Sequence, residues 1–316
     1  MDSRSVALTG KQVIAEIERA VVGKHELLET IMAAVLAGGH ILLEDYPGLG
    51  KTLIARTFAI ALGIEFKRIQ FTPDLLPGDI TGGYIFNRNK NSFEIQKGPV
   101  FANILLADEI NRASPKTQSA LLEAMQEGQV TLEGQSLPLP SPFLVLATQN
   151  PIEYEGTFPL PEAQLDRFML KLSVGYPSVS EEQEIMSRRM KRKQDEVSID
   201  RVVDGNQILG MREIVEEVHV DPDLEKYIAE LVHATREDRR VAVGASPRAS
   251  LAFLKMARAI ASLQGREYVV PDDIKRFASS ILSHRLLLQP EFWMSRQMTD
   301  EVIHDVLLSI PVPVLS

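Results

Sequence analysis

The sequence predicts an α/β domain built on a parallel β-sheet, followed by a smaller helical domain. Three observations indicate this arrangement. A short apolar strand at 40–43 runs through a Gly-rich turn into a helix at 52–62, which is half of a βαβ unit. Two further apolar segments, 103–107 and 143–147, have the length and composition of buried strands. After Pro177 the apolar residues recur at helical spacing and strand patterns become rare.

Length and composition agree with two domains of an ordinary globular protein. The chain of 316 residues exceeds the usual size of a single hydrophobic core, and its content of apolar residues is 45%. We place the boundary near Val179, where the pattern changes. This gives an α/β core over 1–178 and a helical domain over 179–316.

The charge balance and the missing residue types exclude several classes of function. The chain has 34 Lys and Arg against 43 Asp and Glu, and its net charge of −9 disfavours non-specific binding to nucleic acid or anionic membranes. It contains no cysteine, which excludes disulfides and thiolate chemistry. Residues 1–11 do not resemble a signal peptide, and no apolar run approaches the roughly 18 residues of a membrane span. We therefore expect a cytoplasmic protein with no membrane span and no nucleic-acid partner.

The first half of the chain contains two helices and two insertions in addition to the strands. Apolar residues between 11 and 36 recur at helical spacing, with a break at 22–23, which predicts two helices. Ser114 followed by proline is typical of a helix start, and Gly128 of the end of that helix. The segments that look like inserted β-hairpins are 72–96 and 129–139.

The segment DYPGLGKT, residues 45–52, follows a predicted strand and opens a helix, as a phosphate-binding loop does. Gly48 and Gly50 can adopt the backbone angles that turn consecutive N–H groups toward an anion, and the helix N-terminus adds its positive end. Lys51 would reach the terminal phosphates, and Thr52 would offer its hydroxyl to Mg²⁺. A Gly-rich turn without nucleotide is the alternative for this segment alone. The predicted nucleotide-binding residues of the loop are Pro47, Gly48, Leu49, Gly50, Lys51 and Thr52.

Three polar residues follow the other two predicted strands. Asp108 and Glu109 end the strand at 103–107, at the edge of a parallel sheet where ligands bind. Asp108 would hold Mg²⁺ through its water shell, and Glu109 would polarise the attacking water. Asn150 ends the next strand, where its amide can orient that water. Taken alone, solvated acids or an Asn–Pro turn would explain these residues, but their combination with the Gly-rich loop indicates Mg²⁺-dependent hydrolysis of ATP.

The chain resembles the MoxR family of AAA+ ATPases. The matching segments are LLEDYPGLGKT, KGPVFANILLADEINRASPKTQSALLEAMQEGQVTLEG, LATQNP followed by GTFPLPEAQLDRFML, and GASPRAS, and together they extend from Leu42 to Ser250. The resemblance implies an AAA+ P-loop core with a central parallel sheet in an αβα sandwich, followed by a small all-helical lid. The family commonly has Asp where the usual first glycine of the loop would stand, so Asp45 agrees with an active site.

The resemblance also implies roles for residues outside the loop and the strand ends. Asn150 corresponds to the sensor-1 residue, and Val22 and Gly23 correspond to the loop that lines the adenine pocket. Arg167 in LDRF corresponds to the arginine finger, which would act on the ATP of a neighbouring subunit. Arg248 in SPRA corresponds to the sensor-2 arginine of the lid.

The two arginines differ in the physical argument that supports them. Arg248 lies just inside a predicted helix start, where a cation opposes the helix dipole, and the γ-phosphate would reverse that penalty. Arg167 has no such argument, and surface pairing with Asp166 is the alternative. If Arg167 acts on a neighbour, the subunit contact is head-to-tail and closes into a ring, which the resemblance implies is a hexamer.

The resemblance and the two insertions together predict a chaperone that remodels or matures partner protein complexes. Neither insertion is needed to bind ATP, so both could project toward a partner or pack against the core. The resemblance implies that a partner could be a separate protein with a von Willebrand factor A domain. The alternatives are the motor subunit of a magnesium chelatase, a DNA-acting AAA+ motor, and an ATP-bound scaffold without useful turnover.

Overall fold

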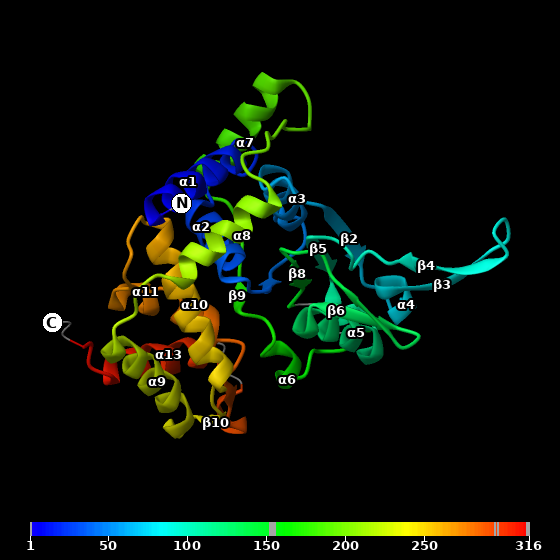
Figure 1. Cartoon of the computed structure of the whole chain (residues 1–316). Coiled ribbons are helices and arrows are strands. Elements are labelled where there is room, and N and C mark those ends of the chain that lie inside the picture. Colours follow the sequence, from blue (N-terminus) through cyan, green and yellow to red (C-terminus); the bar gives the residue numbers. More distant parts are fainter. Residues whose placement is uncertain (1, 152–155, 294, 296, 314–316) are drawn as a thin grey trace.

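The protein has an α/β core beside a group of helices (Figure 1). The structure is a computed structural model, and it describes residues 2–151, 156–293, 295 and 297–313. The core contains a five-stranded sheet in which every pair of neighbouring strands is parallel. From one edge to the other its strands are β2 (Phe66–Gln70), β5 (Ile104–Asp108), β8 (Leu144–Gln149), β1 (Ile41–Glu44) and β9 (Leu170–Leu172).

Alternation along the strands sends side chains into two separate hydrophobic clusters, one on each face of the sheet. In β1, Ile41 and Leu43 join the cluster formed with α1 (Ser3–Glu18), α2 (His25–Ala37) and α3 (Lys51–Ala61), and Leu42 joins the other. The second cluster contains the apolar face of α5 (Pro115–Glu127). The arrangement confirms the predicted αβα sandwich with a central parallel sheet.

Local capping explains where the helices begin. The Asp2 carboxylate accepts a hydrogen bond from the Ser5 N–H at 2.9 Å, so α1 begins at Ser3, well before the predicted start near residue 11. Ser114 caps α5, Pro115 occupies the first helical position, and Gly128 ends the helix with a left-handed conformation. The predicted start and end of α5 are therefore confirmed.

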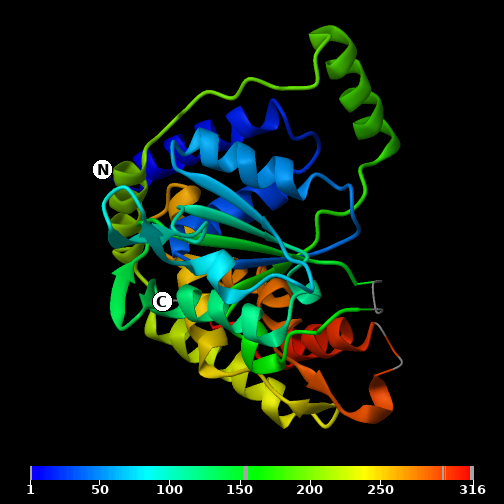
Figure 2. The ribbon, with the colours of Figure 1, turned by 90° about the vertical axis from the view of Figure 1, so that its right-hand side faces the viewer.

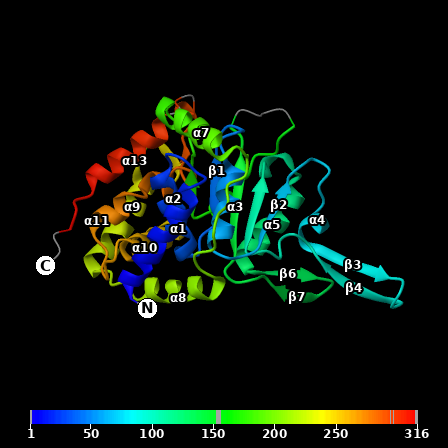
Figure 3. The same ribbon diagram turned by 90° about the horizontal axis from the view of Figure 1, so that it is seen from above.

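Both predicted hairpins are present, and they differ in how they contact the core. The β3–β4 hairpin (Gly82–Asn87 and Ser92–Lys97) follows the short helix α4 (Pro77–Thr81) and projects from the molecule (Figures 1 and 3). The β6–β7 hairpin (Gln129–Leu132 and Gln135–Pro138) buries Val130 and Leu132 in the cluster with α5. Packing thus accounts for the apolar residues of the second hairpin.

The C-terminal part departs from the all-helical prediction in one short element. An antiparallel ribbon pairs β10 (Val241–Val243) with β11 (Leu287–Leu288), strands too short to give a pattern in the sequence. The helices are α7 (Val179–Arg192), α8 (Gly205–Glu216), α9 (Pro222–Glu237), α10 (Pro247–Leu263), α11 (Pro271–Lys275), α12 (Ala278–Leu282) and α13 (Met298–Ser309). Helix α7 projects from the rest of the chain as the green helix in Figure 2. Among the described residues, no helix is long and apolar enough to cross a membrane.

The helical part shares one hydrophobic cluster with the N-terminal helices. Helix α10 packs against both α1 and α2, and buried residues of α8 to α13 belong to the same cluster as those of α1 to α3. Figure 3 shows α1 and α2 between the sheet and the helices α9, α11 and α13. The core and the helical part are therefore joined by continuous apolar packing.

His40 joins three segments at the start of β1. Its Nδ1 accepts the Val145 N–H at 3.0 Å, so the proton of the neutral ring is on Nε2, which donates to the Met125 carbonyl at 3.1 Å. Burial, with a smaller contribution from the charge of Arg212, lowers the pKa of His40 to about 4. Protonation of Nδ1 would remove the bond to Val145, which is why the fold favours the neutral ring.

We expect acid to weaken the fold through His40. Below the unfolded pKa of about 6.5, the unfolded chain binds a proton that the folded chain excludes, so stability is lost as the pH falls from about 6.5 to about 4. Between pH 7 and pH 5 this effect amounts to roughly 2 kcal/mol of the free energy of unfolding. Urea unfolding followed by circular dichroism measures it.

His40→Gln is the control for this prediction, because an amide can make both hydrogen bonds and does not titrate. The variant should lose less stability than the wild type over the same pH interval. Equal losses in the two proteins would show that His40 is not the source.

Candidate active site

The loop between β1 and α3 has the backbone conformation expected of a phosphate-binding loop. Gly48 and Gly50 have φ angles of 85° and 84°, and no heavy atom lies within 4 Å of a Cβ built on either residue. Gly50 is the N-cap of α3 and provides no side-chain oxygen, so the first N–H groups of α3 have no capping side chain. These groups can bind an anion.

A cavity of about 420 Å³ brings the loop together with the ends of three strands. It is lined by loop and strand-end residues that the sequence predicts, namely Pro47, Gly48, Gly50, Lys51, Thr52, Asp108, Glu109 and Asn150. It is also lined by Arg68 and Gln70 of β2 and Thr148 of β8, which the sequence analysis did not identify. The cavity therefore combines phosphate-binding groups, two acids and a strand-end amide.

Asp45 fixes the start of the loop to the chain that follows β9. Its Oδ2 accepts hydrogen bonds from the Ser173 hydroxyl at 2.9 Å, the Val174 N–H at 2.7 Å and the Gly175 N–H at 2.8 Å. Its Oδ1 accepts the Tyr46 N–H at 2.9 Å. Burial alone would raise the pKa of Asp45, but these hydrogen bonds outweigh it and lower the pKa below its usual value. The residue at the usual glycine position is thus an ionised structural anchor.

Lys51 lies in the cavity with its ammonium group close to the loop. Nζ donates a hydrogen bond to the Asp45 carbonyl at 2.7 Å. Burial lowers the pKa of Lys51, and the negative charges of Asp45, Asp108 and Glu109 partly oppose this shift. A triphosphate in the cavity would supply further anionic partners for this ammonium group.

The two acids are held in different ways. The Thr148 hydroxyl donates to Asp108 Oδ1 at 2.5 Å, and Arg68 contacts Asp108 Oδ2 at 2.7 Å. Glu109 has a left-handed backbone with φ of 56°, which is uncommon outside glycine and marks a constrained position. Its Oε2 accepts hydrogen bonds from the Gln70 amide at 2.7 Å and from Arg112 at 3.0 Å.

These residues fit ATP with Mg²⁺. The Thr52 hydroxyl and the Asp108 carboxylate line the same cavity as the loop, and hard oxygen ligands of this kind suit Mg²⁺ when the substrate phosphates complete its coordination. Glu109 is in the same cavity and can polarise a water molecule. The arrangement can therefore bind a nucleoside triphosphate and activate water near its terminal phosphate.

A second cavity, of about 200 Å³, borders the same loop. Apolar side chains predominate in its lining, which includes Val22 and Leu49 with Gly48 and Gly50 of the loop. It has the composition expected of an adenine pocket. Gly23 is not among its lining residues.

Gly23 instead makes a tight turn beside α7. Its φ is 70°, and a Cβ on this residue would lie 1.8 Å from Glu181 Oε1. Val22 and Lys24, on either side of Gly23, do line the cavity. The nucleotide-binding role of Gly23 stays a prediction, and its left-handed backbone gives a separate reason for a glycine at this turn.

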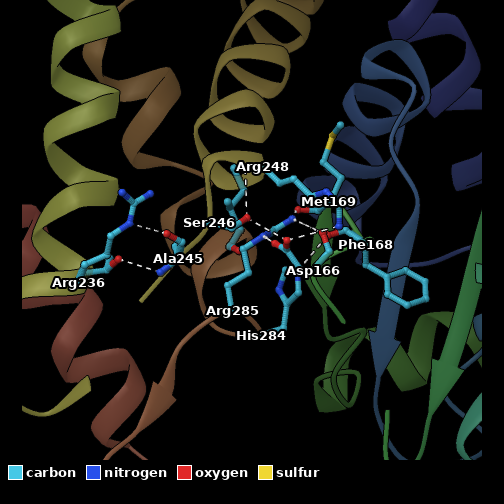
Figure 4. A network of polar contacts seen from close by, with 11 residues as sticks. Asp166, Phe168, Met169, Arg236, Ala245, Ser246, Arg248, His284 and Arg285 are labelled. Atoms are coloured by element: carbon cyan, nitrogen blue, oxygen red, sulfur yellow. Dashed lines mark hydrogen bonds and ion pairs between the residues drawn. The ribbon is translucent and has the colours of Figure 1, made fainter. Parts of the chain in front are cut away.

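Arg167 and Arg248 lie together in a third cavity of about 220 Å³. Its lining shares no residue with that of the cavity at Lys51, so neither arginine is placed at this chain's own phosphate site. Arg248 Nη1 lies 3.6 Å from Asp166 Oδ2 (Figure 4). The Asp166 carboxylate offsets the unfavourable position of a cation at the start of α10. The same cavity is lined by Lys255 and by Arg285, which the sequence analysis did not identify.

Comparisons with known proteins agree with this geometry. Residues 40–170 match the family model described as ATPase family associated with various cellular activities (AAA), and residues 233–306 match the model of an AAA lid domain. The Bacillus subtilis (strain 168) protein YeaC is 48% identical and the alignment covers 97% of this chain and 95% of YeaC. Chaperone MoxR1 of Mycobacterium tuberculosis is 45% identical, and the alignment covers 96% of this chain and 82% of MoxR1. A solved structure from Cytophaga hutchinsonii superposes with a TM-score of 0.92 and is 44% identical in sequence. The superposition covers 99% of this chain and 97% of that structure.

We expect Asp45→Gly to impair the protein, although glycine is the usual residue of the loop motif. The substitution leaves the N–H groups of Val174 and Gly175 without their acceptor, which lowers the free energy of unfolding by roughly 2–4 kcal/mol. The looser loop should raise the KM for ATP. Urea unfolding and steady-state kinetics measure the two effects.

Asp45→Asn keeps one acceptor oxygen, so its free energy of unfolding should fall less and its KM for ATP should rise less. A glycine variant as stable as the wild type, with an unchanged KM, would contradict the anchoring role of Asp45.

Proposed function

This chain belongs to the MoxR family of AAA+ ATPases, and we propose that it hydrolyses ATP to remodel or mature partner protein complexes. The observation that supports hydrolysis most strongly is the meeting of Lys51, Thr52, Asp108, Glu109 and Asn150 in one cavity. The similar mycobacterial protein is named as a chaperone, which supports the use of that energy on other proteins.

The chemistry follows from the residues in the cavity. Lys51 and the loop N–H groups hold the phosphates. Thr52 and Asp108 would hold Mg²⁺, which would supply neutralisation of the charge on those phosphates. Glu109 polarises the water that attacks the γ-phosphorus, and Asn150 orients that water. The bond between the γ-phosphorus and the bridging oxygen then breaks, which releases ADP and phosphate.

The separate position of Arg167 and Arg248 supports a shared active site. Both side chains line one cavity with an excess of positive charge, away from the cavity at Lys51. The buried Nε of Arg167 has no hydrogen-bond partner within the part of the chain that the structure describes. An anion outside the chain, such as the γ-phosphate bound by a neighbouring subunit, would balance the positive charge and accept a hydrogen bond from Arg167. Each subunit would then complete the site of the next one.

A contact of this kind is head-to-tail and closes into a ring. We propose a homohexamer, as the family resemblance implies. The finished site lies at each boundary between two subunits, so an isolated subunit should turn over slowly, because an arginine supplied by a neighbour is worth about 10³-fold or more in rate.

The β3–β4 hairpin is the element best suited to contact a client protein. Phe86 and Phe93 pair across its strands with ring centroids 5.3 Å apart, and Phe93 is 69% exposed. Ile85 is exposed on the same hairpin. Clustered aromatic side chains on a projecting element are typical of protein-binding surfaces. The net charge of −9 favours a protein partner over DNA.

Direct assays distinguish two other activities from the chaperone activity. A DNA-acting motor would show turnover that DNA stimulates and salt suppresses. A magnesium-chelatase motor would support insertion of Mg²⁺ into a porphyrin by the remaining chelatase subunits. The chaperone proposal requires neither effect.

We expect the ATPase activity per subunit to rise with protein concentration, because assembly completes each site. Glu109→Gln, Arg167→Ala and Arg248→Ala should each lower kcat, with the first two reducing it about 10³-fold or more. Mixing Glu109→Gln with Arg167→Ala should restore activity, since the first subunit provides the arginine and the second provides the carboxylate. Steady-state phosphate release measures all of these effects.

The mixture of Arg167→Ala with Arg248→Ala is the control, and it should recover less activity, because each subunit presents a defective arginine cavity to its neighbour. Activity that is independent of concentration, together with a silent Arg167→Ala variant, would contradict the shared site.

We expect the double substitution of Phe86→Ser and Phe93→Ser to separate client binding from hydrolysis. ATPase activity should be retained, because neither residue lines the phosphate cavity, while ATP-dependent reactivation of a chemically denatured reporter enzyme should fall roughly tenfold. Leu308→Ser, at an equally exposed apolar residue on α13, is the matched control. Full reactivation by the hairpin variant would exclude the hairpin as the client contact.

A further inference from the structure

Arg285 is a buried arginine of the helical part that reaches across to the core. It lies between α12 and β11, and its side chain is only 2% exposed. A guanidinium buried to this extent needs acceptors for all of its N–H groups and an opposite charge nearby. The core supplies most of these partners.

The partners of Arg285 are concentrated on one short segment, residues 166–169, which we call the finger loop because it contains Arg167. Nε donates to Asp166 Oδ1 at 2.9 Å, and the two terminal nitrogens donate to the carbonyls of Phe168 at 2.7 Å and Met169 at 3.1 Å. The finger loop connects α6 (Glu162–Leu165) to β9. Figure 4 shows Arg285 beside Asp166, Phe168 and Met169. Arg285 thus binds the residues on both sides of position 167.

His284 adds a second bond to the finger loop. Its ring lies against the Phe168 carbonyl with Nε2 at 3.0 Å from the oxygen. Burial and the charge of Arg285 lower the pKa of His284 well below its usual value, so the ring is neutral and donates from Nε2. Two consecutive residues of the helical part therefore bind the same turn of the core.

Asp166 carries this connection to the start of α10. The Ser246 hydroxyl donates to Asp166 Oδ2 at 2.9 Å and accepts the Arg248 N–H at 3.2 Å, so it caps the helix and binds the finger loop at once. Arg248 also forms its ion pair with Asp166. The side chain of Asp166 is therefore shared by Arg285, Ser246 and Arg248.

We propose that Arg285 and Asp166 are positioning residues that hold Arg167 and Arg248 as one unit, so that both arginines reach a neighbouring subunit's γ-phosphate together. This inference rests on the proposed shared site, because it assigns to Arg285 a function only where two subunits meet. Arg285 does not touch ATP in this assignment, and it acts through the finger loop. The planar guanidinium is required, because an ammonium group cannot bind a carboxylate and several carbonyls in one plane.

The test uses full-length Arg285→Gln and Arg285→Lys proteins. A displacement of about 1 Å in a catalytic group can lower a rate roughly 10²-fold, so kcat should fall by about tenfold to 10²-fold while the KM for ATP changes by less than about threefold. Lysine should not restore kcat. Arg258→Gln is the matched control: this arginine of α10 pairs with Glu216 of α8 and, among the described residues, has no hydrogen bond or ion pair to the finger loop, so kcat should be unchanged.

A subunit-mixing experiment separates positioning from a general loss of folding. An Arg285→Gln subunit keeps its own Glu109, and a Glu109→Gln subunit keeps its own arginines, so mixed rings contain intact sites at some boundaries. An equal mixture should recover about a quarter of the wild-type activity, because one ordered neighbour pair in four combines the two intact halves. The mixture of Arg285→Gln with Arg167→Ala should not exceed the activity of Arg285→Gln alone, because neither subunit presents an intact arginine half.

The outcomes distinguish this inference from the shared site on which it rests. If Glu109→Gln and Arg167→Ala fail to complement each other, the shared site itself is wrong. If that pair complements but a folded Arg285→Gln protein does not complement Glu109→Gln, or if Arg285→Gln alone keeps the wild-type kcat, the positioning role is overturned. Should Arg285→Gln fail to fold, Asp166→Asn replaces it in the same mixture, since Asp166 is 18% exposed and asparagine keeps its shape. Recovery then supports the role, and no recovery overturns it.

Discussion

The parallel register of the central sheet is the constraint on which the candidate active site depends. Gln70 of β2 is paired with Asp108 of β5, and Leu43 of β1 is paired with Thr148 of β8. Because all of these strands run in the same direction, their carboxyl ends meet at one edge of the sheet. The phosphate loop, the two acids and the strand-end amide come from distant parts of the sequence, and the sheet brings them to one cavity. Backbone pairing, more than contacts among the polar residues themselves, thus sets the geometry.

The proposed shared site divides between two places on the chain. One is the cavity at Lys51 with the phosphate loop and the two acids, and the other is the cationic cavity with Arg167 and Arg248. Each half is held by an aspartate that accepts several hydrogen bonds, Asp45 in the loop and Asp166 in the finger loop. Burial of either carboxylate would be unfavourable without partners, and the hydrogen bonds that each accepts compensate for that burial and hold the surrounding chain in place. An aspartate that accepts several hydrogen bonds therefore stabilises each of the two halves.

The sequence was sufficient to predict the parallel sheet, both hairpins and the phosphate loop, because these features depend on local patterns. The glycine positions and the acids after a buried strand identify the cavity without any knowledge of packing. Strand β2 and its residues Arg68 and Gln70 could not be predicted in this way, since an edge strand with mostly exposed side chains has no apolar pattern. Arg285 lies 119 residues from Asp166, and only the folded chain shows that they meet. The same holds for Gly23, whose partner Glu181 belongs to α7.

The shared hydrophobic cluster between the N-terminal helices and the C-terminal helices bears on the kind of movement that the proposed ATP-driven remodelling would use. Helix α10 packs on α1 and α2, and Arg285 and His284 tie the same region to the finger loop. Bending at the boundary between the two parts would separate close-packed side chains and break these bonds. A chain built in this way resists an internal hinge. The mechanical stroke of each nucleotide cycle would then appear as one whole subunit tilting against the next, with the arginine cavity as the surface that senses the neighbour's phosphate.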